Sequence, residues 1–193
     1  MDKLKIGYAL TGSFCTFEKS FETAKRLVGL GHELTPIASF NAFELSTRFG
    51  EASENRKKLT DICGREIIHT IEAAEPIGPK RMFDILIVAP CTSNTLAKLA
   101  TGVNDTPVTM AVKSHLRNMR PVLIAISTND ALAAAAKNIG MLGNYRNYFF
   151  VPYRQDDIVT KPMSMVADFS MMEDAIEHAM RGVQIQPVVL AAK

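Results

Sequence analysis

The sequence predicts an α/β protein of three layers, with a doubly wound parallel sheet between two layers of helices. Two observations predict this fold. Short apolar runs alternate along the chain with segments that have the spacing of amphipathic helices, and this alternation is typical of parallel sheets covered on both faces. A length of 193 residues suits one sizeable core, so we expect residues 1–193 to form a single domain.

Five apolar runs are the predicted strands. Each is bounded by turn or breaker residues and is apolar along most of its length, as expected of strands buried on both faces. The runs are Leu4–Leu10, Leu34–Ala38, Ile85–Ala89, Val122–Ile126 and a weaker one at Tyr148–Val151.

Helices are predicted between these runs. In the first, Phe17, Phe21, Ala24 and Val28 recur at helical spacing, and Gly29 marks its end. The other predicted helices are Glu51–Cys63, Thr92–Ala100, Val108–Leu116, Asp130–Ile139 and Met165–Met180.

Composition argues against several classes of protein. The net charge is +2, from 22 basic and 20 acidic residues, which does not favour a nucleic acid or a membrane surface as partner. No apolar stretch approaches the roughly 20 residues of a membrane span. Cys15, Cys63 and Cys91 lie far apart and the four histidines are scattered. We therefore expect reduced thiols in a cytoplasmic protein and no metal site.

The segment Thr11-Gly12-Ser13-Phe14 follows the first predicted strand. A glycine there lets the backbone approach a ligand closely, and the first N–H groups of the next helix can bind an anion together with the Ser13 hydroxyl. The alternative is an ordinary strand-to-helix turn with a serine cap. The segment is not a dinucleotide fingerprint, because G-x-G-x-x-G occurs nowhere in the chain.

The segment Ser39-Phe40-Asn41 follows the second predicted strand. In an open parallel sheet, ligands bind beyond the carboxyl ends of the strands. Ser39 can there hold a phosphate, and Phe40 can cover a ring. The alternative is a helix start in which Asn41 caps the segment Ala42–Phe49.

The longest candidate motif is Ala89–Asp105, which reads APCTSNTLAKLATGVND. A strand runs into Pro90, four polar or thiol side chains follow, and a helix of small residues comes next. Four such side chains at the end of a strand can bind a heteroaromatic ring and a phosphate together, whereas a helix cap accounts for only one of them. Cys91 is expected to be a packing residue, because the sequence implies no base near it.

This run resembles the signature of the homo-oligomeric flavin-containing cysteine decarboxylases and their flavin prenyltransferase relatives. The Gly12-Ser13 loop and Ser39 fall where that family has its other FMN contacts. The resemblance implies a Rossmann- or flavodoxin-like flavoprotein fold, FMN as cofactor and a trimer-based homo-oligomer. The cofactor-binding residues that we expect on this basis are Gly12, Ser13, Phe14, Ser39, Pro90, Thr92, Ser93, Asn94, Thr95, Ser127 and Asn129.

Three further segments, Glu72–Lys80, Asn104–Lys113 and Tyr148–Asp157, are similar to the B-subunit family of dipicolinate synthases, and the likeness runs nearly end to end. It implies synthesis of pyridine-2,6-dicarboxylate from a dihydrodipicolinate-type precursor, in the mother cell of a sporulating bacterium. It also implies a separate A subunit that carries NAD(P). The missing dinucleotide fingerprint in this chain agrees with that division of labour.

His69 is the candidate catalytic residue. The decarboxylases carry a catalytic histidine shortly before the signature strand, and His69 is the histidine nearest to that position. The following Glu72–Met82 resembles an insertion that is either a lid over the cofactor or a contact for the A subunit. The alternative for His69 is packing beside a strand. The remaining histidines are expected on the surface: His32, His115 and His178.

A dianionic substrate requires cations near its ring. The candidates, each of which can also be merely solvated, are Lys80, Arg81, Lys113, Arg117 and Arg154. Three functions remain open at this point: a flavin-linked dehydrogenation, a stand-alone FMN-dependent decarboxylation, and FMN binding in a non-catalytic partner of the A subunit.

Overall fold

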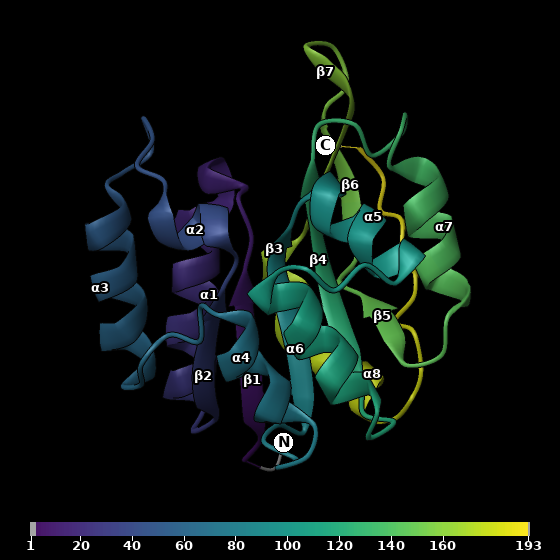
Figure 1. The fold of residues 1–193 in the computed structure, drawn as a ribbon. Helices are drawn as coiled ribbons and strands as arrows, with labels where there is room; N and C mark the ends of the chain where they lie inside the picture. The colour runs from purple at the N-terminus through teal and green to yellow at the C-terminus, as the bar shows by residue number, and fades with distance from the viewer. Residues whose placement is uncertain (1–2, 193) are drawn as a thin grey trace.

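A mixed seven-stranded sheet forms the centre of the computed structural model, which describes residues 3–192 (Figure 1). Five strands are parallel, and they confirm the five predicted runs. Their spatial order is β2-β1-β3-β4, with β5 also paired to β4. Their bounds are β1 Lys5–Leu10, β2 Glu33–Ala38, β3 Ile85–Cys91, β4 Val122–Thr128 and β5 Tyr148–Phe150.

The other two strands, β6 (Tyr153–Asp157) and β7 (Lys161–Ala167), form an antiparallel hairpin, so the sheet is not purely parallel as predicted. The hairpin pairs with the carboxyl end of β4, where Ser127 lies opposite Val166, and its tip projects beyond the sheet (Figure 1). The prediction of one helix over Met165–Met180 is therefore wrong in its first part.

Helices cover both faces of the sheet, and they range from short single turns to the long helix that follows β1. Their bounds are α1 Phe17–Gly29, α2 Phe40–Glu44, α3 Ala52–Cys63, α4 Ile71–Ala74, α5 Ser93–Thr101, α6 Pro107–Leu116, α7 Ala136–Asn144 and α8 Met172–Met180.

Two of the helices begin later in the chain than predicted. Asp168 is the N-cap of a 3₁₀ turn at Phe169–Met171, and its side chain accepts a hydrogen bond from the backbone N–H of Ser170. Helical structure therefore begins after Asp168 and not at Met165. The helix predicted over Asp130–Ile139 begins at Ala136, because residues 129–135 form turns in which Ala133 and Ala135 donate to the carbonyl of Asp130.

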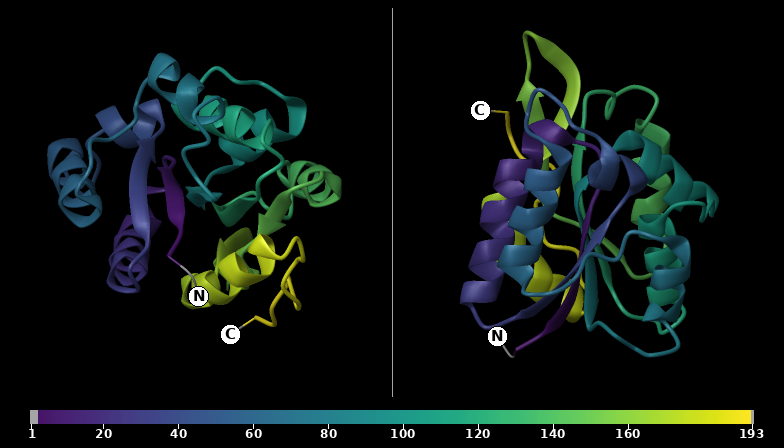
Figure 2. Two further views of the ribbon diagram at one scale, coloured as in Figure 1. Left: turned by 90° about the horizontal axis from the view of Figure 1, so that it is seen from below. Right: turned by 60° about the vertical axis from the view of Figure 1, so that its left-hand side comes forward.

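Each face of the sheet has its own hydrophobic core. Side chains alternate along β1, so that Ile6, Tyr8 and Leu10 pack on the face covered by α1, α3 and α8, and Ala9 packs on the face covered by α4, α5, α6 and α7. Figure 2 shows the two layers of helices on opposite sides of the sheet. The structure thus confirms the predicted three-layer, flavodoxin-like α/β fold.

The Glu72–Met82 segment packs against α6 and leads into the amino end of β3. The Gly78 N–H donates to the Ser114 hydroxyl at 2.8 Å, and that hydroxyl donates to the Glu75 carbonyl at 2.5 Å. A Cβ on Gly78 would lie 2.0 Å from the Ser114 carbonyl oxygen, so the close packing requires a glycine. The segment therefore lies at the edge opposite the carboxyl ends of the strands, and within one chain it is no lid over that edge.

Two histidines expected on the surface are buried. His115 of α6 has Nε2 3.1 Å from the Pro121 carbonyl, and His32 accepts a hydrogen bond from the Leu4 N–H through Nδ1. In both rings the other nitrogen is buried without a partner among the described residues. Burial lowers the pKa of His32 and lowers that of His115 to about 4, because the charged ring loses its hydration. Helical periodicity did not distinguish His115 from an exposed residue, and the position of His32 directly after Gly31 suggested an exposed turn.

The lowered pKa of His115 predicts that acid destabilises the fold. The unfolded chain takes up a proton near the ordinary histidine pKa of about 6.5, whereas the folded chain does so only near 4. The contribution of neutral His115 to the free energy of unfolding is therefore fully present above pH 6.5 and is lost as the pH falls towards 4. Between pH 7 and pH 5, we expect the free energy of unfolding, measured with urea, to decrease in the unmodified chain by about 2 kcal/mol more than in His115→Gln. His178→Gln is the control, and equal pH dependence in His115→Gln and the unmodified chain would contradict the prediction.

Candidate functional site

The order β2-β1-β3-β4 places a topological switch point between β1 and β3. The chain leaves β1 towards the face of α1 and leaves β3 towards the opposite face, that of α5. In open α/β sheets, the crevice outside the carboxyl ends of the strands at such a point is the usual ligand site. The candidate ligand-binding segments that follow β1, β2, β3 and β4 all lie at this one edge.

Thr11 joins the loops on the two sides of the switch point. Its side chain, 1% exposed, donates to the Pro90 carbonyl at 2.8 Å and accepts from the Thr92 N–H at 3.0 Å. Both partners belong to the signature motif. The sequence prediction included Thr11 only as part of its loop. A polar residue at the end of an apolar strand was the available sign, because a buried hydroxyl there requires a hydrogen-bond partner.

Three hydroxyl groups meet over the end of β3. The hydroxyl oxygens of Ser13, in the loop after β1, and Ser127, near the carboxyl end of β4, are 2.8 Å apart, and the Thr16 hydroxyl lies 2.6 Å from that of Ser127 and 2.9 Å from that of Ser13. The structure therefore brings together two predicted residues that are 114 positions apart. Thr16 was missed by the sequence prediction. Its position three residues after Ser13, within one turn, was the available sign.

The N-terminus of α5 presents free donors at the same edge. Thr92 is the N-cap, but its side chain makes no capping hydrogen bond to the helix backbone; its oxygen lies 3.3 Å from that of Thr95. The first N–H groups of a helix have no partner within the helix and carry partial positive charge, which suits an anion. Ser93 is half-buried and Asn94 is exposed, so both can reach a ligand.

The second half of the signature has a structural role. Lys98 of α5 pairs with Asp105, with its Nζ 2.5 and 2.6 Å from the two carboxylate oxygens. Gly102 ends the helix with a φ of 74°, in the left-handed region that favours glycine. These residues return the chain from α5 to α6. The signature thus combines a first half with accessible polar groups at the start of α5 and a second half that fixes the following turn.

Ser39 lies at the same edge but already has a role in the fold. It is the N-cap of α2, where its hydroxyl accepts from the Ala42 N–H at 3.3 Å, so the cap predicted at Asn41 lies two residues earlier. Gly12 is half-buried and faces Asn41; a Cβ added there would lie 3.5 Å from the Asn41 Cβ, an ordinary contact. Within this chain, a residue with a Cβ would therefore fit at position 12 without a clash.

The remaining predicted cofactor residues differ in exposure. Phe14 is half-buried and packs against Phe17, with ring centroids 5.0 Å apart, while Asn129 is exposed after β4. Cys91 is fully buried, and burial raises the pKa of its thiol. This agrees with a packing role for Cys91, because a thiol is a weak nucleophile compared with a thiolate.

His69 lies beside the carboxyl end of β2. The preceding Ile68 pairs with Ile37 of β2 in a parallel bridge, and its carbonyl accepts from the Ala38 N–H at 2.9 Å. The half-buried His69 ring stacks on Phe43 with centroids 3.9 Å apart. Although His69 precedes β3 in sequence, this extra pairing carries it to the edge where the flavin-family contacts are expected.

The predicted cations are not gathered at this edge. Lys80 and Arg81 belong to the segment before β3, and Lys113 is exposed on α6 next to Ser114, which binds that segment. All three, together with Arg117 at the end of α6 next to Gly78, lie towards the amino ends of the strands. Arg154 of β6 lies level with the carboxyl end of β4 but is separated from it by β7, and its guanidinium pairs with the Asp168 carboxylate at 2.5 Å.

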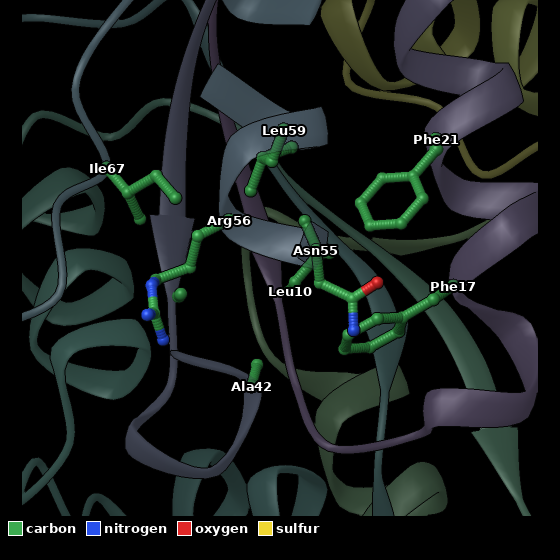
Figure 3. Close-up of a pocket in the computed structure, with 9 residues that line it drawn as sticks. Leu10, Phe17, Phe21, Ala42, Asn55, Arg56, Leu59 and Ile67 are labelled. Atoms are coloured by element: carbon green, nitrogen blue, oxygen red, sulfur yellow. The ribbon is translucent and has the colours of Figure 1, made fainter. Parts of the chain in front are cut away.

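Two hollows occur elsewhere in the described part of the chain. The first, shown in Figure 3, lies between α1, α3 and the end of β2, and its volume of about 10 Å³ admits no more than about one water molecule. The second is an open hollow of about 800 Å³ beside β5, lined by residues of α7 and of the C-terminal segment. Neither is lined by a predicted FMN contact.

Residues 3–192 offer neither a membrane-spanning helix nor a metal-binding cluster. No helix there is both long and apolar enough to span a membrane. No group of three or more histidine, cysteine, aspartate or glutamate side chains there has an arrangement that could hold a metal ion.

The fold and this edge are those of a flavin-type α/β protein, and the family model described as Flavoprotein matches residues 1–181. The B subunit of dipicolinate synthase from Bacillus subtilis is 45% identical over 186 residues, which cover 96% of this chain and 93% of that protein. The chain belongs to the Flavoprotein family and, within it, to the family of dipicolinate synthase B subunits.

Solved structures agree with this assignment. The crystal structure of the dipicolinate synthase B subunit from Bacillus halodurans has a TM-score of 0.90 and 39% identity, with 98% of this chain and 97% of that chain covered. DmrB of Burkholderia xenovorans, solved in complex with FMN, has a TM-score of 0.69 and 18% identity, with 92% and 95% covered. The second likeness concerns the fold alone.

The pairing of Lys98 with Asp105 predicts that the pKa of Asp105 changes when Lys98 is replaced. The Lys98 ammonium lowers the pKa of the Asp105 carboxyl through its hydrogen bond and its charge. In Lys98→Met we expect the pKa of Asp105, followed by carboxyl-carbon NMR, to rise towards its ordinary value. Lys137→Met, a change at an exposed lysine of α7, is the control. An unchanged pKa of Asp105 in Lys98→Met would show that the ion pair does not persist in solution.

Proposed function

We propose that this chain is the flavoprotein subunit of a dipicolinate synthase. In this proposal it binds FMN at the carboxyl edge of β1 to β4 and acts with an A subunit to convert a dihydrodipicolinate-type precursor into pyridine-2,6-dicarboxylate. The observation that carries the proposal is the 45% identity to the Bacillus subtilis relative over nearly the whole length of both chains.

The donors at this edge fit FMN. A phosphate suits the free N–H groups at the start of α5 together with the hydroxyls of Ser13 and Ser39. Asn94 is exposed there, and its amide offers both a donor and an acceptor for the edge of a heteroaromatic ring. The FMN contacts that we propose are Gly12, Ser13, Phe14, Ser39, Pro90, Thr92, Ser93, Asn94, Thr95, Ser127 and Asn129.

The chemistry requires removal of two hydrogens from the precursor ring. One leaves as a hydride with the electron pair of its bond, and the other leaves as a proton while its bonding electrons complete the aromatic ring. FMN, when bound, supplies the hydride acceptor. His69 is the proposed base that takes the proton, because a neutral imidazole accepts protons near neutral pH.

Arg154 is the remaining candidate for a substrate carboxylate. It lies on β6, one strand beyond β7 from the carboxyl end of β4, and its side chain is about one-fifth exposed, so a carboxylate would share its guanidinium with Asp168. A planar guanidinium has five N–H donors and can serve two carboxylates.

The proposed assembly has three parts. Copies of this chain form a trimer-based homo-oligomer, as the resemblance to the flavin-containing decarboxylases implies. This oligomer associates with an A subunit that carries NAD(P), for which this chain has no G-x-G-x-x-G motif. The complex acts in the cytoplasm of the mother cell of a sporulating bacterium.

FMN binding can be separated from folding with two variants. Among the described residues, the side-chain amide of Asn94 has no hydrogen-bond partner, and Gly12 has space for a Cβ. We expect Asn94→Ala and Gly12→Ala to keep the melting temperature of the FMN-free protein and to weaken FMN binding, Asn94→Ala by about tenfold through one lost hydrogen bond. Asn144→Ala on α7 is the control. Wild-type FMN affinity in both variants, measured by fluorescence titration, would exclude this edge as the FMN site.

The absorption spectrum of the FMN-loaded chain tests the reaction. Addition of the dihydro precursor, with and without the A subunit, should bleach the flavin band as pyridine-2,6-dicarboxylate forms, because hydride transfer reduces the flavin. Release of carbon dioxide with precursor alone would instead indicate a stand-alone decarboxylase. Product formation with the A subunit, without any change in the flavin band, would indicate that FMN is structural and that the A subunit performs the oxidation.

A further inference from the structure

The His69 ring is held by contacts from two separate segments. It lies parallel to the ring of Phe43 in α2, with 3.9 Å between centroids and 2° between planes. Its Nδ1 lies 3.0 Å from the carbonyl oxygen of Ile67. That carbonyl belongs to the segment fixed against β2, where the Ile68 N–H donates to the Pro36 carbonyl at 2.9 Å. Both the plane of the imidazole and one of its nitrogens are therefore constrained.

Phe43 is in turn held by Arg56 of α3. The guanidinium carbon lies 4.8 Å from the centroid of the Phe43 ring, and Nη1 donates to the Phe43 carbonyl at 2.5 Å. A guanidinium over an aromatic face is attracted by the negative charge of that face. One arginine thus fixes both the backbone and the ring of Phe43.

The contact with Ile67 determines which nitrogen carries the proton. A carbonyl oxygen only accepts hydrogen bonds, so the hydrogen of a neutral His69 is on Nδ1 and the lone pair is on Nε2. Among the described residues Nε2 has no hydrogen-bond partner, and the side chain is half-buried and not enclosed. His69 therefore presents a free acceptor nitrogen at the carboxyl edge of the sheet.

We propose that Phe43 and Arg56 are positioning residues, which hold His69 in the tautomer with a protonated Nδ1 and leave Nε2 ready to take a proton. The link to turnover rests on the proposed function, in which His69 is the base. The tautomer itself does not, since it follows from contacts within this chain. A leucine at position 43 keeps an apolar contact but offers no plane on which the imidazole can stack.

The tautomer is measured by ¹⁵N NMR of the FMN-free chain labelled at histidine. The His69 signals are those missing in His69→Gln. We expect the unmodified chain and Phe43→Tyr to have a protonated Nδ1, and Phe43→Leu and Arg56→Met to contain a mixture of both tautomers. Arg48→Met is the matched control, because Arg48 lies 4.9 Å over the exposed Phe49 ring and should not affect His69.

Turnover in the presence of the A subunit gives the second readout. We expect Phe43→Leu to lower kcat about tenfold and to leave KM within about twofold. The reason is that His69 is no longer held with a free Nε2 in its reactive orientation, while substrate binding persists. Phe43→Tyr should restore kcat. A protonated Nε2 in the unmodified chain, or an unchanged tautomer in folded Phe43→Leu, would overturn the proposal. Full turnover of His69→Gln with the expected tautomers would instead refute His69 as the base and leave its positioning intact.

Discussion

The buried hydroxyl of Thr11 is the contact on which the geometry of the site depends. The ends of β1 and β3 must lie side by side although their chains depart to opposite faces of the sheet, and the Pro90 carbonyl and Thr92 N–H at that point need partners. The Thr11 hydroxyl donates to this carbonyl, which also accepts from the Thr11 N–H at 3.3 Å, and the same hydroxyl accepts from the Thr92 N–H. A buried polar group without a partner costs about 1–3 kcal/mol, so this arrangement strongly favours one relative position of the two loops.

With the two loops fixed, the ligand-facing groups follow. Ser13 comes two residues after Thr11, and its hydroxyl meets Ser127 across the end of β3. Thr92 is the N-cap of α5, and its side chain makes no hydrogen bond to the first N–H groups of the helix. Lys98 and Asp105 then fix the exit of the same helix. The donors expected for FMN are therefore set before a ligand arrives, which reduces the entropy lost on binding.

The sequence was sufficient to predict the parallel strands and the edge at which the loops after them meet, because buried strands are apolar along their length and loops that follow parallel strands meet at one edge. It was insufficient for Met165, where the hairpin pairing of β7 with β4 overrode the helical pattern. Lys80 precedes β3 and therefore lies at the opposite edge of the sheet. The direction of the strand decides this position, although Lys80 is close to His69 in sequence. His69 itself reaches the site edge only through the pairing of Ile68 with Ile37, which no periodicity indicates.

The most direct test of the proposed site is a crystal structure of the chain with FMN bound. We expect the phosphate within hydrogen-bond distance of the Ser13 hydroxyl or the first N–H groups of α5, and the flavin ring next to Asn94. FMN bound in the open hollow beside β5, or at any place away from the carboxyl ends of β1 and β3, would contradict this placement.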